Sequence, residues 1–337
     1  MALWRYVYRR LWQMAIVLLG ISIITFVLAR YVPGDPVLTY LGVHAREETI
    51  RRLRDKWGLD RPVWEQFFIF LKGLLQGDLG TSISTQHPVT SDLAAFFPFT
   101  IELATSSLLV SIIVGVPLGV ISAVRRNKTI DHVSRIFALT GSSMPIFWLA
   151  IMAIYLFYFR LGWVPGAGVI GSDVQRPATI TGLYTIDSLI TGNFPAFVST
   201  LHHLVLPSLV LGSYSTAVTT RIVRSSMLEV LGQDYVRTAR AKGLPERIVI
   251  YKHALKNTLI ATVTIVGLNY GGLLSGAVIT ETVFARPGLG TYSIGSMLAL
   301  DYPAIMGVTL IATIVYAFIN LAVDLLYGFL DPRIRYG

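Results

Sequence analysis

Residues 103–124 read LATSSLLVSIIVGVPLGVISAV, an uncharged run that begins directly after Glu102 and ends directly before Arg125. A helix that crosses the hydrocarbon core of a bilayer needs about 20 residues of this kind. Strands of a membrane barrel would instead alternate polar and apolar residues over segments of about 10 positions. The run therefore predicts a membrane-spanning helix, and it decides the fold class.

Five further apolar runs of similar character lie on either side of this one. They cover residues 11–29, 136–159, 204–220, 257–280 and 302–323. Composition agrees, because 53% of the 337 residues are hydrophobic and 14% are charged, against about 25% charged in soluble domains. We predict an all-α integral membrane protein with six transmembrane helices, the first of them retained and not cleaved as a signal peptide.

The basic residues are distributed unevenly along the chain, which carries a net charge of +9. If the N-terminus is cytoplasmic, 17 of the 28 Lys and Arg fall on cytoplasmic segments. These segments lie before residue 11, at 125–135, at 221–256 and after residue 330. The two short outer segments, 161–203 and 285–301, carry only Arg176 and Arg286. This positive-inside pattern predicts cytoplasmic termini, and it makes a nucleic-acid partner unnecessary.

The segments outside the runs differ in character. Within 31–95, the stretch 45–57 is amphipathic, with Ile50 on its apolar face. Residues 63–75 are strongly apolar but too few to span, so we expect them at the interface or packed on the bundle. Segment 161–203 is rich in Gly, Pro, Thr and Ser, which predicts an irregular loop.

Residues that carry catalysis or bind cofactors are not evident. The chain has no cysteine, its six His are scattered, and no Walker A motif is present. We therefore predict no enzymatic activity, no catalytic residues, and no metal or cofactor bound by this chain. If the protein takes part in active transport, nucleotide hydrolysis belongs to another subunit.

The largest inner segment, 221–256, reads as helix, break, helix. Residues 227–242 favour a helix, Gly243 supplies a break, and Pro245 suits the first turn of the next helix. A basic helix of this kind could be a solvated loop at the lipid surface, and the residues that follow favour another role.

Residues 234–244 read DYVRTARAKGL, and they resemble the cytoplasmic loop of permease subunits from bacterial dipeptide, oligopeptide and nickel ABC importers. Arg237, Thr238 and Ala239 stand where the wider importer superfamily has Glu-Ala-Ala. Two of the three differ from that pattern, and Arg-Thr-Ala is similar to the version in peptide importers, so the resemblance is to the peptide and nickel branch. Other motifs resemble the same family in the same order: GDLGTS at 77–82, ETVF at 281–284, PGLG at 287–290, DYP at 301–303 and DPRIR at 331–335.

This resemblance implies a domain organisation. Residues 1–30 would form a cytoplasmic tail and the first helix, and 31–95 an extracytoplasmic segment. Residues 96–329 would form a type I ABC importer transmembrane domain that includes the coupling loop 221–256, and 330–337 a cytoplasmic tail.

The resemblance also implies an ATPase-coupling site in the basic helix. Small side chains there would allow close approach, and cations would reach acidic groups on the partner. The expected coupling residues are Asp234, Tyr235, Arg237, Thr238, Ala239, Arg240, Ala241, Lys242 and Gly243. The alternative is that these cations serve only membrane topology.

The resemblance further implies the partners of the chain. They are a second homologous permease, two cytoplasmic ABC ATPases that use ATP and Mg, an extracytoplasmic substrate-binding protein, and the lipids of the bacterial inner membrane. The chain would form half of a pathway for di- or oligopeptides. A nickel complex or glutathione are alternative substrates. A secondary transporter acting alone is a rival class, typically marked by intramembrane charges or internal repeats.

Uncharged polar residues within the apolar runs are candidates to line that pathway. They are Ser142, Ser143, Tyr214, Ser215, Asn269, Tyr270 and Ser275. Pro117, Pro145 and Pro207 predict kinks near a cavity. The spacing of Gly115 and Gly119 predicts a close helix crossing.

Overall fold

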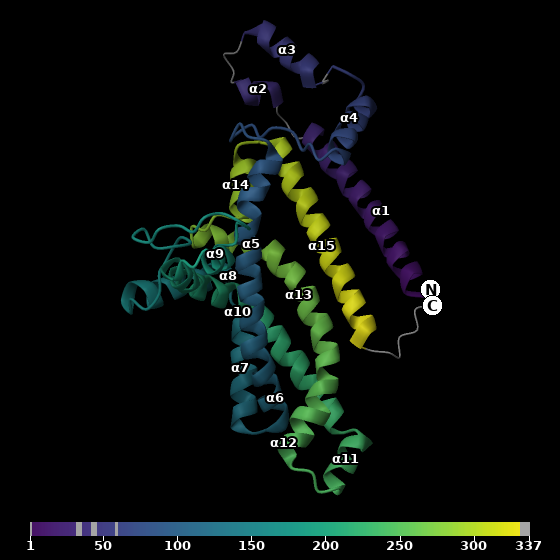
Figure 1. Cartoon of the computed structure of the whole chain (residues 1–337), viewed down its shortest axis with the longest axis vertical. Helices are drawn as coiled ribbons and strands as arrows, with labels where there is room; N and C mark the ends of the chain where they lie inside the picture. The colour runs from purple at the N-terminus through teal and green to yellow at the C-terminus, as the bar shows by residue number, and fades with distance from the viewer. Residues whose placement is uncertain (1, 32–35, 42–45, 58–59, 331–337) are drawn as a thin grey trace. The chain divides into compact units, whose positions relative to one another are not determined.

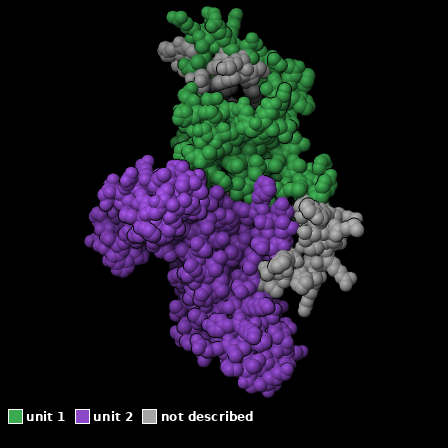
Figure 2. All heavy atoms as spheres, in the orientation of Figure 1, with its two compact units in different colours: residues 1–98, 287–317 green, residues 99–286, 318–337 purple. Residues whose placement is uncertain are grey.

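The structure is a computed structural model that describes residues 2–31, 36–41, 46–57 and 60–330 (Figure 1). Side chains at some helical positions, Ser275 among them, lie outside this description. The described elements are helices, with one isolated antiparallel bridge between Thr81 and Pro88. The chain divides into two compact units (Figure 2): Met1–Pro98 with Pro287–Ala317, and Phe99–Arg286 with Phe318–Gly337.

The membrane-spanning helices agree with the predicted fold class. In the described part of the chain, four helical stretches are long and apolar enough to span: Tyr8–Val27, Val89–Val124, Phe194–Leu231 and Tyr302–Leu326. Two bent pairs bring the total to six if each counts as one span. They are Thr129–Ser143 with Ile146–Arg160, bent by 106°, and Glu246–Leu259 with Thr262–Leu274, bent by 50°. The third predicted span, 136–159, is therefore broken between two helices, whereas the fifth, 257–280, lies in one continuous helix that is bent.

Unit 1 contains helices from both ends of the chain. They are α1 (Ala2–Tyr31), α2 (Pro36–Leu41), α3 (Glu47–Trp57), α4 (Val63–Leu75), the start of α5 (Val89–Val110), α14 (Leu289–Leu298) and the start of α15 (Tyr302–Leu330). The apolar helix α4 packs on α1, where the Phe26 ring lies 5.3 Å from Phe67 and 5.8 Å from Phe70. This is one of the two placements expected for a helix too short to span.

Two of the sequence motifs meet inside unit 1. The fully buried Asp301, which opens the DYP motif, accepts hydrogen bonds from the Ser82 hydroxyl and from the Ser84 backbone N–H, the latter at 3.0 Å. Asp301 also accepts from the Ala304 N–H at 3.2 Å, which caps α15. One carboxylate thus fixes the GDLGTS loop to the start of a spanning helix.

Unit 2 is organised around one long helix, α10 (Phe194–Leu231). The other elements are the end of α5, η1 (Ser111–Gly115), α6 (Val116–Val124), α7 (Thr129–Ser143), α8 (Ile146–Ala153), η2 (Ile154–Arg160), α9 (Tyr184–Ile190), α11 (Asp234–Ala241), α12 (Glu246–Ile248), η3 (Val249–Leu255), α13 (Lys256–Val283) and the end of α15. The three η segments are π-helical. Helix α10 packs against α6, α7, α8, α9 and α13.

The length of α10 exceeds the predicted run 204–220 at both ends. Its first turn is capped by Asn193, whose side chain accepts the Ala196 N–H at 3.1 Å. The apolar run marked only the part without charges, whereas the helix continues through polar residues to Leu231. Segment 161–203 is accordingly less irregular than expected, because it contains α9 and the first turns of α10.

The small residues of α6 allow the close helix crossing that their spacing predicted. A Cβ at Gly119 would lie 2.8 Å from the Thr220 carbonyl oxygen and 2.7 Å from the Val223 Cβ. Any larger residue would therefore push α6 away from α10. Among the prolines, Pro145 lies at the 106° break between α7 and α8, whereas Pro207 lies inside the continuous helix α10.

Candidate functional site

The predicted coupling segment forms a short helix, α11, at one end of unit 2 (Figure 1). Gly243 follows α11 with a φ of 74°, and its N–H donates to the Arg240 carbonyl at 2.9 Å. Such a positive φ favours glycine, as expected for the predicted break. The expected continuous helix over 227–242 is wrong, however, because α10 ends at Leu231 and Gly232-Gln233 separate it from α11.

One face of α11 is turned into the protein. Val236 and Val249 are fully buried, and Ala239 is 7% exposed in the same apolar cluster. Leu231, from the end of α10, packs against this cluster. Ala239 therefore does not lie on the exposed surface where it was expected to contact a partner. Its small side chain instead allows α11 to pack against η3.

The other face of α11 carries the remaining predicted coupling residues. Exposed side chains there include Tyr235, Thr238 and Lys242. Arg240 forms a two-point ion pair with Glu246, with its Nη2 2.7 Å from Oε1 and its Nε 3.1 Å from Oε2. This pair joins the end of α11 to the start of α12. The charge of Arg240 is therefore partly neutralised by Glu246 and is less available to a partner protein. The exposed face is consequently smaller and less basic than the sequence suggested.

A buried ion pair supports the same end of unit 2. Asp131 is fully buried and receives the Arg224 Nε at 2.8 Å and Nη2 at 2.9 Å. It also accepts from the Ser122 hydroxyl and from the Asn127 N–H. These contacts tie α6, α7 and α10 together through one carboxylate. The sequence reading missed Asp131, although it is the one acid in the basic segment 125–135.

The second candidate site is a cavity of about 290 Å³ within unit 2. It lies where the α7–α8 break meets α10 and α13. Four of the seven predicted pathway residues line it together: Ser142, Tyr214, Ser215 and Asn269. For Pro145, the predicted kink near a cavity is confirmed, since Met144 and Ile146, on either side of Pro145, line this cavity.

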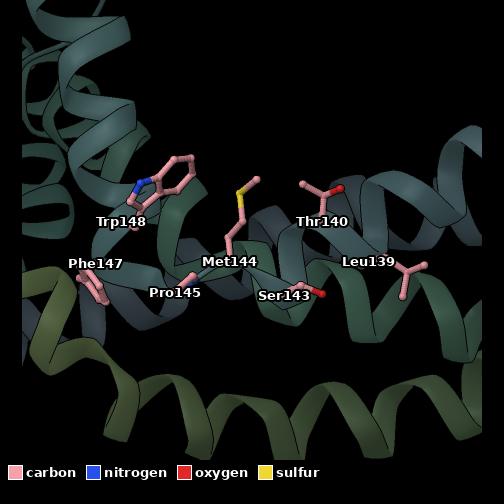
Figure 3. Close-up of a pocket in the computed structure, with 7 residues that line it drawn as sticks. All are labelled: Leu139, Thr140, Ser143, Met144, Pro145, Phe147 and Trp148. Atoms are coloured by element: carbon pink, nitrogen blue, oxygen red, sulfur yellow. The ribbon is translucent and has the colours of Figure 1, made fainter.

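The other predicted pathway residues are elsewhere or outside the description. Ser143 lines a neighbouring, mainly apolar hollow along the α7–α8 break, whose side chains are drawn in Figure 3. The Tyr270 hydroxyl lies 2.8 Å from Thr105 Oγ1, in a hydrogen bond to α5. The side chain of Ser275 lies outside the described residues.

A second buried ionic group lies at the other end of α13. The Arg286 Nη2 is 3.3 Å from Glu102 Oε2, and both side chains are almost completely buried. Glu102 also accepts the Thr185 N–H at 2.7 Å, and Arg286 donates to the Gly168 carbonyl at 3.2 Å. This group fastens the loop between η2 and α10 to α5 and α13. Glu102 directly precedes the apolar run 103–124, and an acid at that border was the only signal the sequence offered for this group.

Within that loop, Asp187 gathers four hydrogen bonds. Its carboxylate accepts from the Ile180, Thr181 and Gly182 N–H groups and from the Thr181 hydroxyl, at 2.7–3.1 Å. Burial by itself raises the pKa of Asp187, but the hydrogen bonds, led by those from Thr181, outweigh burial and hold this pKa below its ordinary value.

Comparison with known proteins places these features in a family. A family profile described as "Binding-protein-dependent transport system inner membrane component" matches residues 115–336, and the profile for the N-terminal part of such components matches residues 3–104. The chain belongs to this family. Like other members, it is an all-helical, multi-pass permease subunit of an ABC transporter in the inner membrane, and it is not itself a catalyst.

Relatives of the chain match it over its full length. It is 44% identical to the "Probable D,D-dipeptide transport system permease protein DdpB" of Escherichia coli, over 100% of this chain and 99% of that protein. It is also 44% identical to the dipeptide transport system permease protein DppB of Alkalihalophilus pseudofirmus, over 98% of this chain and 99% of that one.

A solved structure shares the fold. The inward-facing MetNI methionine ABC transporter matches with a TM-score of 0.52 and 17% identity, over 69% of this chain and 93% of the other. Membership of a binding-protein-dependent system implies that an ATPase and a binding protein act with this permease.

Proposed function

We propose that this chain is one of two homologous permeases that together form the membrane pathway of a dipeptide importer. The observation that carries the proposal is the 44% identity, over the full length, to permeases named for dipeptide and D,D-dipeptide transport. In this assignment residues 96–329 are the type I transmembrane domain, the termini are cytoplasmic, and the chain binds no cofactor. Two partner ATPases use ATP and Mg, and an extracytoplasmic binding protein delivers the peptide.

The exposed face of α11 is the proposed contact with an ATPase. It protrudes between α10 and α13, is supported by the Val236–Ala239–Val249 cluster, and presents Tyr235, Ala241 and Lys242. Because buried contacts fix one face of α11 to the rest of unit 2, a force applied to its exposed face moves the helix without unwinding it. The revised contact set contains the predicted coupling residues without Ala239.

The transport cycle follows from differential binding. ATP binding would close the ATPases and move α11, and the cluster shared with Leu231 would pass that movement to α10. The Asp131–Arg224 pair would carry it to α6 and α7, because buried two-point ion pairs resist separation. The binding protein favours the state that opens outward and the nucleotide-free ATPases favour the state that opens inward, so each ligand shifts the population.

Reconstitution tests the assignment. The chain is coexpressed with a second permease, two ATPases and a binding protein of the same kind of system, and the complex is placed in vesicles. We expect uptake of a labelled dipeptide that needs both ATP and the binding protein. Uptake that persists without any ATPase would establish the rival secondary transporter. Selective uptake of glutathione or a nickel complex would replace the peptide assignment but keep the importer.

The proposed contact with the ATPase has a separate test. Because the chain has no cysteine, an introduced thiol is the single reactive thiol in it. A thiol introduced by Ala241→Cys on the exposed face should cross-link to an ATPase carrying a single cysteine, and nucleotide should change the yield. A thiol introduced by Lys128→Cys checks topology. Labelling of either position from outside intact cells would contradict the cytoplasmic assignment.

A further inference from the structure

The cavity at the α7–α8 break contains two polar groups that the fold leaves without partners. Ser215 is 2% exposed, and neither its Oγ nor the Nδ2 of Asn269 has a hydrogen-bond partner among the described residues. Both residues line the same cavity. Burying a polar group without a partner is costly, so this arrangement needs an explanation other than packing.

Several hydroxyls near Ser215 on α10 are satisfied within the chain. Thr216 Oγ1 donates to the Gly212 carbonyl at 2.8 Å, and Thr220 Oγ1 donates to the Thr216 carbonyl at 2.8 Å. Ser208, which is also 2% exposed, lies 2.6 Å from the hydroxyl of Ser106. The usual return bond from serine to its own helix is therefore not made at Ser215. Thr200 Oγ1 is a further buried hydroxyl of α10 without a partner among the described residues, but Thr200 does not line this cavity.

The remaining lining of the cavity defines what could satisfy the two groups. No charged side chain is among the residues that line it, and its apolar part comes from Met144, Ile146, Leu211 and Leu273. Asn269 Nδ2 can only donate, whereas the Ser215 hydroxyl can also accept. The complementary ligand is neutral at this point and offers one carbonyl oxygen and one N–H beside an aliphatic group. A peptide amide with a small apolar side chain has this pattern.

The size of the cavity limits the ligand. At about 290 Å³ it is just below the range of roughly 300–1,000 Å³ that pockets for drug-sized ligands occupy. A segment the size of a dipeptide fits this volume, whereas several residues of a longer peptide would not.

We propose that this cavity is a binding subsite for a single peptide amide on the translocation path, with Asn269 donating to the carbonyl and Ser215 accepting the N–H. The inference rests on the proposed peptide-import function. A neutral hydrogen bond contributes little net binding free energy, so the subsite binds weakly and releases its ligand readily. It selects for the amide group and not for the charged ends of the peptide.

The test uses the complete importer in vesicles, without ATP. Ser142→Cys places a thiol on the cavity wall and leaves both proposed contacts intact, because the Ser142 hydroxyl donates to the Leu139 carbonyl at 3.0 Å. The probe is L-alanyl-L-alanine, present while a methanethiosulfonate reagent modifies the thiol. We expect the dipeptide to slow modification, and L-alanine, which has no peptide amide, to leave the rate unchanged.

Two variants and a matched control, each added to Ser142→Cys, assign the effect. Ser215→Ala and Asn269→Ala should each weaken protection by about two- to tenfold, the equivalent of one neutral hydrogen bond. Ser208→Ala removes an equally buried but partnered hydroxyl outside the cavity and should leave protection unchanged. In transport assays, uptake per ATP hydrolysed should fall for the first two variants and not for the control.

Several results would overturn the subsite. The first is that alanyl-alanine does not protect the thiol at position 142, and the second is that protection survives both Ser215→Ala and Asn269→Ala. The third is that the thiol reacts in detergent but not in lipid vesicles, because acyl chains fill the cavity. Failure of the importer assignment would look different, since it removes ATP-dependent uptake in the unmodified protein, whereas the labelling assay needs neither ATP nor transport.

Discussion

Two regions of unit 2 are ordered by different means: the proposed coupling segment, 232–245, and the loop between η2 and α10, 161–193, called the outer loop after its predicted side of the membrane. The segment from Gly232 to Pro245 is shaped by signals next to one another in the chain: a glycine with positive φ, a proline before α12, and an ion pair between neighbouring turns. The outer loop is ordered by two buried carboxylates. Asp187 accepts from residues 180–182 of the loop itself, and Glu102, on α5, accepts from Thr185 and pairs with Arg286. Turn residues such as Gly243 and Pro245 can be recognised in a sequence. The sequence around a buried acid does not show which donors it will bind.

The largest expected effect is at Ala239, on the buried face of α11. Ala239→Asp would place a carboxylate among Val236, Val249 and Leu244. An unpaired buried charge costs about 3–5 kcal/mol, so we expect the segment to lose its packing while the spans still insert. Limited proteolysis and hydrogen exchange over 232–250 measure this, and transport should be lost with it.

Ala241→Asp is the matched control for that change. Ala241 is exposed on the opposite face, where a surface substitution changes stability by about 0.5 kcal/mol or less. Protease resistance should therefore remain, while cross-linking to the ATPase and stimulated ATP hydrolysis fall. If both variants unfold the segment equally, the division of α11 into a buried and a contact face is wrong.

The second effect concerns the outer loop. Asp187→Ala removes an acceptor of four hydrogen bonds, and bonds to a charged group contribute about 1.5–3 kcal/mol each, part of which water would restore. We expect a local loss of about 3 kcal/mol or more, seen as amide exchange roughly 100-fold faster over 171–193. Exchange in α11 should not change. Equal acceleration in both regions would show that they are not independently ordered.

The same carboxylate predicts a pH dependence. Because the pKa of Asp187 is lowered in the folded loop, its contribution to stability is complete above the unfolded value of about 3.9 and is lost as the pH falls through the folded value. Loop protection should be constant from about pH 7 to 5 and decline below about pH 4. Asp187→Asn should start lower and show a smaller decline, so an equal decline in both proteins would remove Asp187 as the cause.

The limits of sequence reading follow the same division. Each candidate span in the described part of the chain overlaps one of the predicted apolar runs, and Gly243 and Pro245 marked the turn between α11 and α12. The polar residues at 142, 214, 215 and 269 were named as a group, although nothing in the sequence indicated that they meet at one cavity. The inward orientation of Ala239 depends on Val249, ten residues later across a turn, and was therefore missed. Arg224 was counted as a topological charge because its partner, Asp131, lies on another helix.

A third, smaller effect tests the local signals of the coupling segment. Gly243→Ala keeps ample space, since no atom lies within 4 Å of the added Cβ, but it must adopt a φ of 74°. The expected cost is about 1–2 kcal/mol, seen as fraying of α11 in hydrogen exchange and a partial loss of coupling. Gly232→Ala is the control, because its φ of −83° suits any residue. Equal fraying in both variants would mean that the φ of Gly243 is unimportant.

The smallest effect is expected at the ion pair that closes the segment. Arg240 and Glu246 are 42% and 54% exposed, and exposed pairs contribute about 0.2–1 kcal/mol. Glu246→Gln keeps the shape and one hydrogen-bond acceptor, so the segment should stay folded, and its loss of protection should be smaller than that of Gly243→Ala. The same change releases Arg240 from its partner and leaves its charge available to acidic groups on an ATPase. We therefore expect cross-linking from Ala241→Cys to stay equal or increase, and 0.5 M salt to reduce that difference. A loss of cross-linking together with a loss of protection would instead make the pair a structural requirement of the contact face. In that case the coupling segment would depend on an acceptor outside its own helix, as the outer loop depends on Glu102 of α5, and the contrast between the two regions would be weaker than their local sequences suggest.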